Sequence, residues 1–266
     1  MDDDEVLGLG GVGFGYPRGP HVFDSVDLSL RPGQRIALLG ANGTGKTTLL
    51  RILVGLTKPS TGTVRLDGSA LTGSRADRTR LRSRVQMVLQ EPDDQIVAAT
   101  VRADVSFGPA NLGLDRTEVV ARVDEAMAAL GITALADRTP NQLSFGQRKR
   151  VAIAGAVAMR PRVLLLDEAT AGLDPRAVED LLGTLTELAG AGTAIVLATH
   201  DVDVAWSWSK ESLVLGSATG VATLHRGNTH DLLTDAALLA SARLTVPWGA
   251  AVSRTLGRLV LRPDQI

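Results

Sequence analysis

The stretch Gly40-Ala41-Asn42-Gly43-Thr44-Gly45-Lys46-Thr47 decides the fold, because it matches the phosphate-binding pattern G-x-x-x-x-G-K-[ST]. It follows the apolar run Arg35–Leu39, whose length and composition predict a buried strand. It precedes Leu49–Leu56, where apolar side chains share one face of a predicted helix. A glycine-rich turn between a buried strand and a helix lets backbone N–H groups face phosphate oxygens.

The residues of this loop divide the work of binding a nucleoside triphosphate. Lys46 supplies a positive charge for the β- and γ-phosphates, and the hydroxyl of Thr47 is placed to ligate Mg²⁺. We therefore predict that ATP and Mg²⁺ are the cofactors, and that residues Gly40 to Thr48 bind the nucleotide.

The strand–helix alternation continues along the chain. Val163–Leu166 and Ala194–Ala198 read as buried strands of a parallel sheet. Between them, Pro175 stands at a favoured first helical position, and apolar residues then repeat every three to four positions. The pattern predicts an α/β fold with a mostly parallel sheet.

Two other regions depart from this alternation. Val6–Gly10, Val26–Leu30 and Thr63–Leu66 resemble short strands, which predict an N-terminal antiparallel β-subdomain. Residues 92–160 read as an inserted helical subdomain, in which Asp115 can cap one helix. Residues after Pro247 give no clear signal.

A second acidic motif ends one of the predicted strands. Val163–Leu166 leads directly into Asp167 and Glu168, so both carboxylates are delivered to the carboxyl end of the sheet, where ligands bind in open α/β folds. Asp167 would hold Mg²⁺. Glu168 could polarise the attacking water as a general base.

A third motif makes the chain recognisable. Leu143-Ser144-Phe145-Gly146-Gln147 resembles the LSGGQ signature of ATP-binding cassette proteins. The surrounding motifs agree in order and spacing with that family; they are Tyr16, Gln90, Ala171-Gly172-Leu173-Asp174 and Thr199-His200-Asp201. The resemblance covers about residues 6 to 235 and implies a P-loop NTPase core.

The resemblance implies roles for these residues. Two cassettes of this family pack head to tail, so that the phosphate loop of one chain faces the signature of the other. Ser144, Gly146 and Gln147 would then serve the γ-phosphate across the interface. The family roles of the other matched residues are a Mg²⁺ and water sensor at Gln90, a γ-phosphate contact at His200, adenine stacking at Tyr16 and nucleotide binding by the D-loop residue Asp174.

The resemblance also implies a domain organisation. Residues 1–240 would form a single ATP-binding domain, followed by a C-terminal tail at 241–266. Within the domain, residues 1–91 and 161–240 would make the α/β core and 92–160 the helical subdomain.

Each of these roles has a plainer structural alternative. Asp174 precedes Pro175 and is a good helix N-cap. His200 alone could be a turn histidine, and Tyr16 could pack on the core. The run Arg148-Lys149-Arg150 could suggest nucleic acid, but we favour a solvated helix face, because no aromatic platform accompanies it.

Two residues depart from the family pattern. Phe145 replaces the first glycine of the signature, and would be strained if that position needed a positive φ. Ala169 replaces the common proline after the glutamate. This makes the backbone less stiff there and removes no side chain that could bind the nucleotide or Mg²⁺.

A longer stretch narrows the resemblance. Gln90–Ile96, Val105–Pro109 and Asn111–Leu114 look like the ATPase components of energy-coupling-factor importers, a group that includes cobalt and nickel uptake systems. This implies an ATPase that drives uptake of a transition-metal ion or vitamin through separate integral membrane subunits, with a second ATPase chain as partner. The chain would lie at the cytoplasmic face of the membrane as a peripheral protein.

Composition is compatible with this interpretation. The chain has 28 basic and 29 acidic residues and no cysteine, so a strong basic field for nucleic acid and cysteine chemistry are both excluded. The longest apolar run, Val151–Met159, is far shorter than the ~20 residues of a membrane-spanning helix. The alternatives are a soluble ABC ATPase acting on nucleic acid or the ribosome, and a nucleotide sensor without catalysis. Lys46, Asp167, Glu168 and His200 argue against the sensor.

Overall fold

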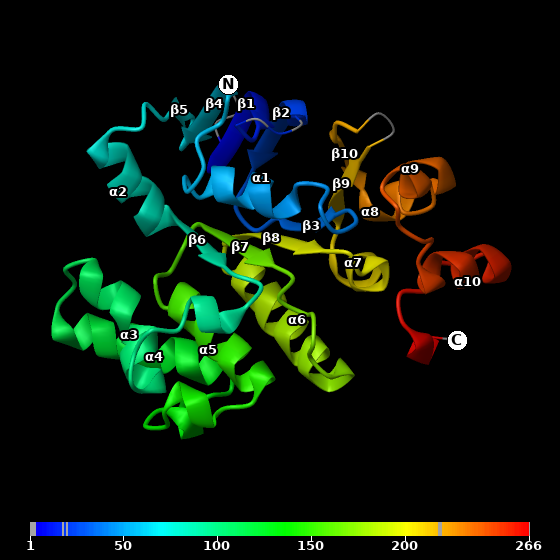
Figure 1. The fold of residues 1–266 in the computed structure, drawn as a ribbon. Coiled ribbons are helices and arrows are strands. Elements are labelled where there is room, and N and C mark those ends of the chain that lie inside the picture. Colours follow the sequence, from blue (N-terminus) through cyan, green and yellow to red (C-terminus); the bar gives the residue numbers. More distant parts are fainter. Residues whose placement is uncertain (1–3, 18, 20, 218–219, 266) are drawn as a thin grey trace.

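Two sheets and a set of helices make up the fold (Figure 1). The structure is a computed structural model and describes residues 4–17, 19, 21–217 and 220–265. The strands are β1 Leu7–Gly15, β2 His21–Leu30, β3 Arg35–Leu39, β4 Thr61–Leu66, β5 Ser69–Ala70, β6 Val85–Val88, β7 Val163–Asp167, β8 Ala194–Thr199, β9 Glu211–Gly216 and β10 Thr223–Asn228. The α-helices are α1 Lys46–Leu53, α2 Arg75–Arg84, α3 Val101–Asn111, α4 Arg116–Ala129, α5 Phe145–Val157, α6 Pro175–Gly190, α7 Val202–Trp208, α8 Thr229–Leu232, α9 Ala236–Ser241 and α10 Trp248–Leu256. Short 3₁₀ turns are η1 Pro92–Asp94, η2 Thr133–Leu135, η3 Pro140–Gln142 and η4 Pro263–Gln265.

The larger sheet carries the functional motifs. Its strand order is β10-β9-β3-β8-β7-β6, and every pairing from β9 to β6 is parallel. All five residues of β7 and all six of β8 are buried, as expected for strands covered on both faces. The predicted α/β fold is confirmed, and β3 has the predicted bounds.

The smaller sheet is antiparallel, with the order β2-β1-β4-β5. Its strands are longer than the sequence pattern predicted, because β1 and β2 also include the buried residues Val12, Phe14 and Phe23, which stand among glycines and polar residues in the sequence. One face packs with α1 and one face of the larger sheet around a shared core that includes Phe23, Leu49 and Leu165. The predicted antiparallel subdomain is therefore present.

Helices α3, α4 and α5 pack together beyond strand β6, in green in Figure 1. They share a second core with the other face of the larger sheet, through residues such as Val105, Met127 and Ile153. The Asp115 carboxylate caps α4 as expected, accepting from the Glu118 N–H at 2.9 Å.

The C-terminal residues are fastened to the phosphate loop and to α7. Helix α9 includes position 240 and ends at Ser241. The residue after the helix, Ala242, accepts a backbone hydrogen bond from the Ala41 N–H at 3.1 Å. Farther on, the Trp248 N–H donates to Asp203 at 2.7 Å, and the Trp206 indole donates to the Val260 carbonyl at 2.9 Å. These contacts give the C-terminal residues a packed position that no sequence pattern indicated.

Within the part of the chain that the structure describes, no helix is both long enough and apolar enough to cross a membrane.

Candidate nucleotide-binding site

The phosphate loop joins β3 to α1 and is curled around the side chain of Lys46. The Lys46 ammonium donates to the Gly40 carbonyl at 2.7 Å and lies 3.4 Å from that of Ala41. Gly45 caps α1 with φ 102°, and a Cβ there would lie 2.5 Å from Val22. Only glycine fits this position, so the loop backbone can approach a ligand closely.

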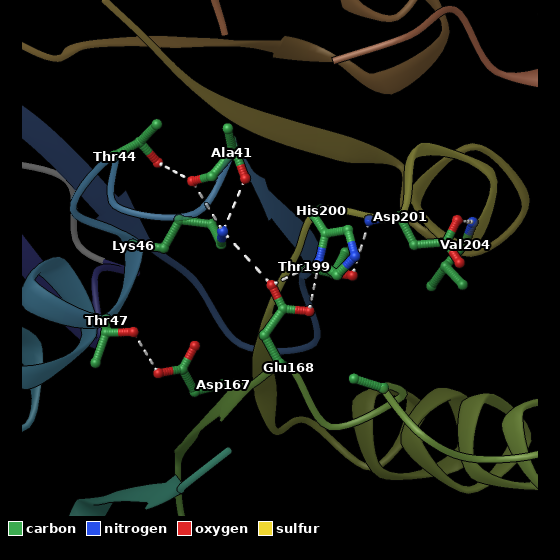
Figure 2. Close-up of polar contacts among 12 residues, drawn as sticks. Ala41, Thr44, Lys46, Thr47, Asp167, Glu168, Thr199, His200, Asp201 and Val204 are labelled. Atoms are coloured by element: carbon green, nitrogen blue, oxygen red, sulfur yellow. Dashed lines mark hydrogen bonds and ion pairs between the residues drawn. The ribbon is translucent and has the colours of Figure 1, made fainter. Parts of the chain in front are cut away.

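Thr47 and Asp167 meet where α1 faces the end of β7. The Thr47 hydroxyl donates to the Asp167 carboxylate at 2.6 Å (Figure 2). Burial raises the pKa of Asp167 above its usual value, and the nearby Glu168 charge raises it further, while the Thr47 hydrogen bond opposes both. Burial therefore favours a proton or a cation at this carboxylate.

Glu168 lies between two basic groups. Its carboxylate is 3.5 Å from the Lys46 ammonium and 3.1 Å from His200 Nδ1, as Figure 2 shows. Its backbone has φ 49°, in the left-handed region that a residue with a side chain adopts at a cost. The strained backbone aims a buried carboxylate from the end of β7 toward the phosphate loop and the His200 turn.

A cavity of about 350 Å³ joins most of the predicted nucleotide-binding residues. Its lining is Tyr16, Val22, Asn42, Gly43, Gly45, Lys46, Thr47, Thr48, Gln90, Asp167 and Glu168. The Tyr16 ring is half exposed at the rim, and its hydroxyl is 2.9 Å from the Thr48 hydroxyl. Gly40, Ala41 and Thr44 shape the loop, with the Thr44 hydroxyl donating to the Ala41 carbonyl.

The signature residues lie outside this cavity. Ser144 caps α5, accepting from the Gln147 N–H at 3.3 Å while the Gln147 side chain accepts from the Ser144 N–H at 2.9 Å. Asp174 is likewise the N-cap of α6. Ser144 and Asp174 are exposed, so the role of the signature and Asp174 at a second chain's nucleotide stays a prediction.

Phe145 is the first residue of α5 and is not among the described residues with positive φ. The strain that its replacement of glycine could have caused is therefore absent.

The expectation of a solvated face at Arg148-Lys149-Arg150 is wrong for its central residue. Lys149 is only 1% exposed, whereas Arg148 and Arg150 are half-buried and pair with Asp93 and Asp180. Lys149 is spaced four residues from both Phe145 and the buried Ile153, and that spacing is the signal that would have placed it inward.

The donor set at Thr47 and Asp167 fits Mg²⁺. A hydroxyl and a carboxylate already converge, and Mg²⁺ in phosphate-binding enzymes takes one or two protein oxygens together with substrate phosphates. Among residues 4–17, 19, 21–217 and 220–265, no cluster of three His, Asp or Glu side chains could hold a metal by itself.

Comparisons with known proteins agree with these motifs. Residues 23–171 match the family described as ABC transporter. The cobalt import ATP-binding protein CbiO of Rhodobacter capsulatus is 45% identical over 258 residues, covering 97% of this chain and 90% of that protein. The energy-coupling factor transporter ATP-binding protein EcfA of Methanothermobacter thermautotrophicus is 37% identical, covering 91% of this chain and 77% of its own length. The structure of CbiO1 from Clostridium perfringens, part of the ABC transporter complex cbiONQ, superposes with a TM-score of 0.79 at 35% identity, covering 94% of this chain and 99% of that one.

Proposed function

The chain belongs to the ABC transporter family of ATP-binding proteins, and from this premise we propose that it drives an energy-coupling-factor importer whose substrate is a cobalt or nickel ion or a vitamin. It is an ATPase that works with membrane subunits and a second ATPase chain. The comparisons do not favour a role on nucleic acid or the ribosome.

The position of Glu168 is the observation that supports the proposed mechanism of ATP hydrolysis. Its buried carboxylate lies within 3.5 Å of the phosphate-loop lysine and within 3.1 Å of His200. A carboxylate held beside the γ-phosphate subsite can take a proton from an attacking water. We assign Glu168 as general base, with Lys46 and His200 as γ-phosphate contacts.

Thr47 and Asp167 would hold Mg²⁺, and Gln90 at the same cavity would complete the set. When bound, Mg²⁺ neutralises charge on the β- and γ-phosphates. A cation held by Asp167 would offset the burial that raises the pKa of this carboxyl group.

The turn after Gln90 is our proposed coupling surface, and we define it as Asp93–Val97. Asp94 and Val97 are exposed, Val97 at 72%. Asp93 forms an ion pair with Arg148 of α5, so the surface is joined to the signature helix (Nε to Oδ1, 2.8 Å). Gln95 instead serves the turn, accepting from the Leu89 N–H at 3.0 Å.

Uptake in whole cells tests the proposal. A host lacking the chain should lose accumulation of radioactive Co²⁺, Ni²⁺ or one vitamin, and the wild-type gene should restore it. Glu168→Gln should restore none, because the amide cannot take the proton, although the variant still binds ATP. If Glu168→Gln hydrolyses ATP at the wild-type rate, the base assignment is wrong.

The coupling surface is tested in the same strain. Asp94→Ala combined with Val97→Ser should reduce uptake while ATP affinity stays within about twofold. Glu187→Ala, at an exposed position on α6, is the matched control and should change neither. Copurification of the wild-type chain with DNA or ribosomes, and with no integral membrane protein, would contradict the importer.

A further inference from the structure

Lys149 is a buried cation that the proposed chemistry does not use. It stands in the second turn of α5, and its side chain is among the largest fully buried ones in the described chain. Desolvation lowers its pKa, opposed by the charges of Glu91 and Glu168. Burying an ammonium group costs free energy unless its N–H donors form hydrogen bonds or ion pairs.

The Lys149 ammonium donates hydrogen bonds to backbone carbonyls just after β7. The ammonium donates to the Glu168 carbonyl at 2.7 Å and to the Ala171 carbonyl at 2.6 Å. The Ala171 N–H also donates to the Glu168 carbonyl, at 3.1 Å. Lys149 therefore closes the 168–171 turn from the side of α5.

This turn contains the strained residue of the site. Glu168 has φ 49°, and a backbone in this region persists only where its surroundings fix it. The Ala198 carbonyl accepts the Glu168 N–H at 2.9 Å from one side, and Lys149 holds its carbonyl from the other. Both peptide groups of Glu168 are thus restrained while its carboxylate faces Lys46 and His200.

Phe145 supports Lys149 from the start of α5. The ammonium lies 5.2 Å from the centre of the Phe145 ring, within the range of a cation–π interaction. The same ring lies against Gly172, where a Cβ would be 3.0 Å from Cε1. The aromatic residue that replaces the signature glycine thus covers the ammonium and the 168–172 backbone together.

We propose that Lys149, supported by Phe145, is a positioning residue that ties the signature helix to the backbone of Glu168 and so sets the orientation of the catalytic carboxylate. The inference rests on the proposed role of Glu168 as general base. Lys149 also connects two predicted sites through α5. Ser144, five residues earlier, caps the same helix at the surface predicted to contact the nucleotide of the second chain, and Lys149 contacts the backbone of Glu168. A shift of α5 on nucleotide binding there would be transmitted through one side chain to Glu168 of this chain.

Lys149→Met tests the proposal in the full-length chain, because methionine keeps an unbranched apolar stem and lacks the donors. We expect kcat for ATP hydrolysis to fall by about 10–100-fold, since misplacing a catalytic group by ~1 Å can cost ~100-fold. The Kd for ATP should stay within about threefold, because the phosphate loop is untouched. Lys149→Gln, which keeps a shorter N–H donor, should retain more activity than Lys149→Met. Lys58→Met, at an exposed lysine, is the matched control and should match wild type.

A double-mutant cycle with Glu168→Gln separates positioning from general support. Because Lys149 acts through Glu168, Lys149→Met should cost little more in the Glu168→Gln chain, measured as single-turnover hydrolysis. An equal loss in both backgrounds would overturn this inference alone. So would a parallel loss of ATP affinity and melting temperature, or an unchanged kcat. A wild-type rate for Glu168→Gln would overturn the base assignment and this inference with it.

Discussion

Asp167 shows how burial prepares one carboxyl group for a cation. Its side chain is 3% exposed and its pKa is raised, chiefly by desolvation. A carboxyl with a raised pKa in the folded state favours folding below the unfolded pKa, about 3.9, and this contribution is lost as pH rises through the folded pKa. Ionisation of Asp167 therefore destabilises the chain when neither metal nor nucleotide is bound.

Asp167→Asn removes that buried charge and keeps an acceptor for the Thr47 hydroxyl. In EDTA and without nucleotide, we expect the variant to melt about 2–4 °C higher at pH 7.5, the shift that ~1 kcal/mol gives in a domain of roughly this size. The difference should shrink as pH is lowered, and differential scanning calorimetry at several pH values measures it. Mg²⁺-dependent ATP hydrolysis should be lost in parallel. A variant that melts lower at neutral pH would show that the carboxylate is already compensated.

At the scale of elements, the signature serine has a structural role and a predicted chemical one that can be separated. Ser144 caps α5 and Ser74 caps α2, where it accepts from the Asp77 N–H. Replacing either serine with alanine should cost about 1 kcal/mol of folding free energy. Only Ser144→Ala should also lower ATP hydrolysis, because Ser144 is predicted to contact the γ-phosphate of the second chain. Thermal unfolding and ATPase rate on both variants give the comparison, and equal ATPase rates would leave Ser144 as a cap alone.

The elements that could be predicted are those whose pattern is local. Strands β3, β7 and β8 are mostly apolar runs. The motif Gly40–Thr47 by itself predicts a loop between a strand and a helix. Asp115 and Asp174 were predictable caps, because the side chain bonds to the backbone three residues away. The domain division at 92–160 and the roles of the signature residues stay predictions.

The whole molecule contains contacts that no local pattern encodes. Lys149 bonds to carbonyls 19 and 22 residues away, and Ala41 bonds to Ala242. Both are backbone acceptors, and backbone carbonyls carry no sequence signature. The C-terminal helix α10 is the clearest example, since Gly249 packs closely against the Trp206 ring, which also donates to the Val260 carbonyl, and no sequence motif indicates these contacts.

Gly249 tests that packing against a matched glycine. A Cβ at Gly249 would lie 2.4 Å from Trp206 Nε1 and 2.8 Å from the Val260 carbonyl, whereas a Cβ at Gly183 in α6 meets nothing within 4 Å. We expect Gly249→Ala to destabilise the fold by ~1–3 kcal/mol through overpacking. Gly183→Ala should stabilise it by ~0.5–1 kcal/mol through helix propensity. Urea unfolding of the two variants measures both, and a stable Gly249→Ala would mean that α10 is free to move away from α7.

The bond from Ala41 to Ala242 also orders events during translation. The phosphate loop leaves the ribosome about 200 residues before its last backbone partner does, a delay of ~10–40 s at usual rates of synthesis. A nascent chain therefore carries the phosphate-binding motif long before the loop is fastened in its final shape. We expect ATP to engage the loop in its final shape only after Ala242 has left the ribosome.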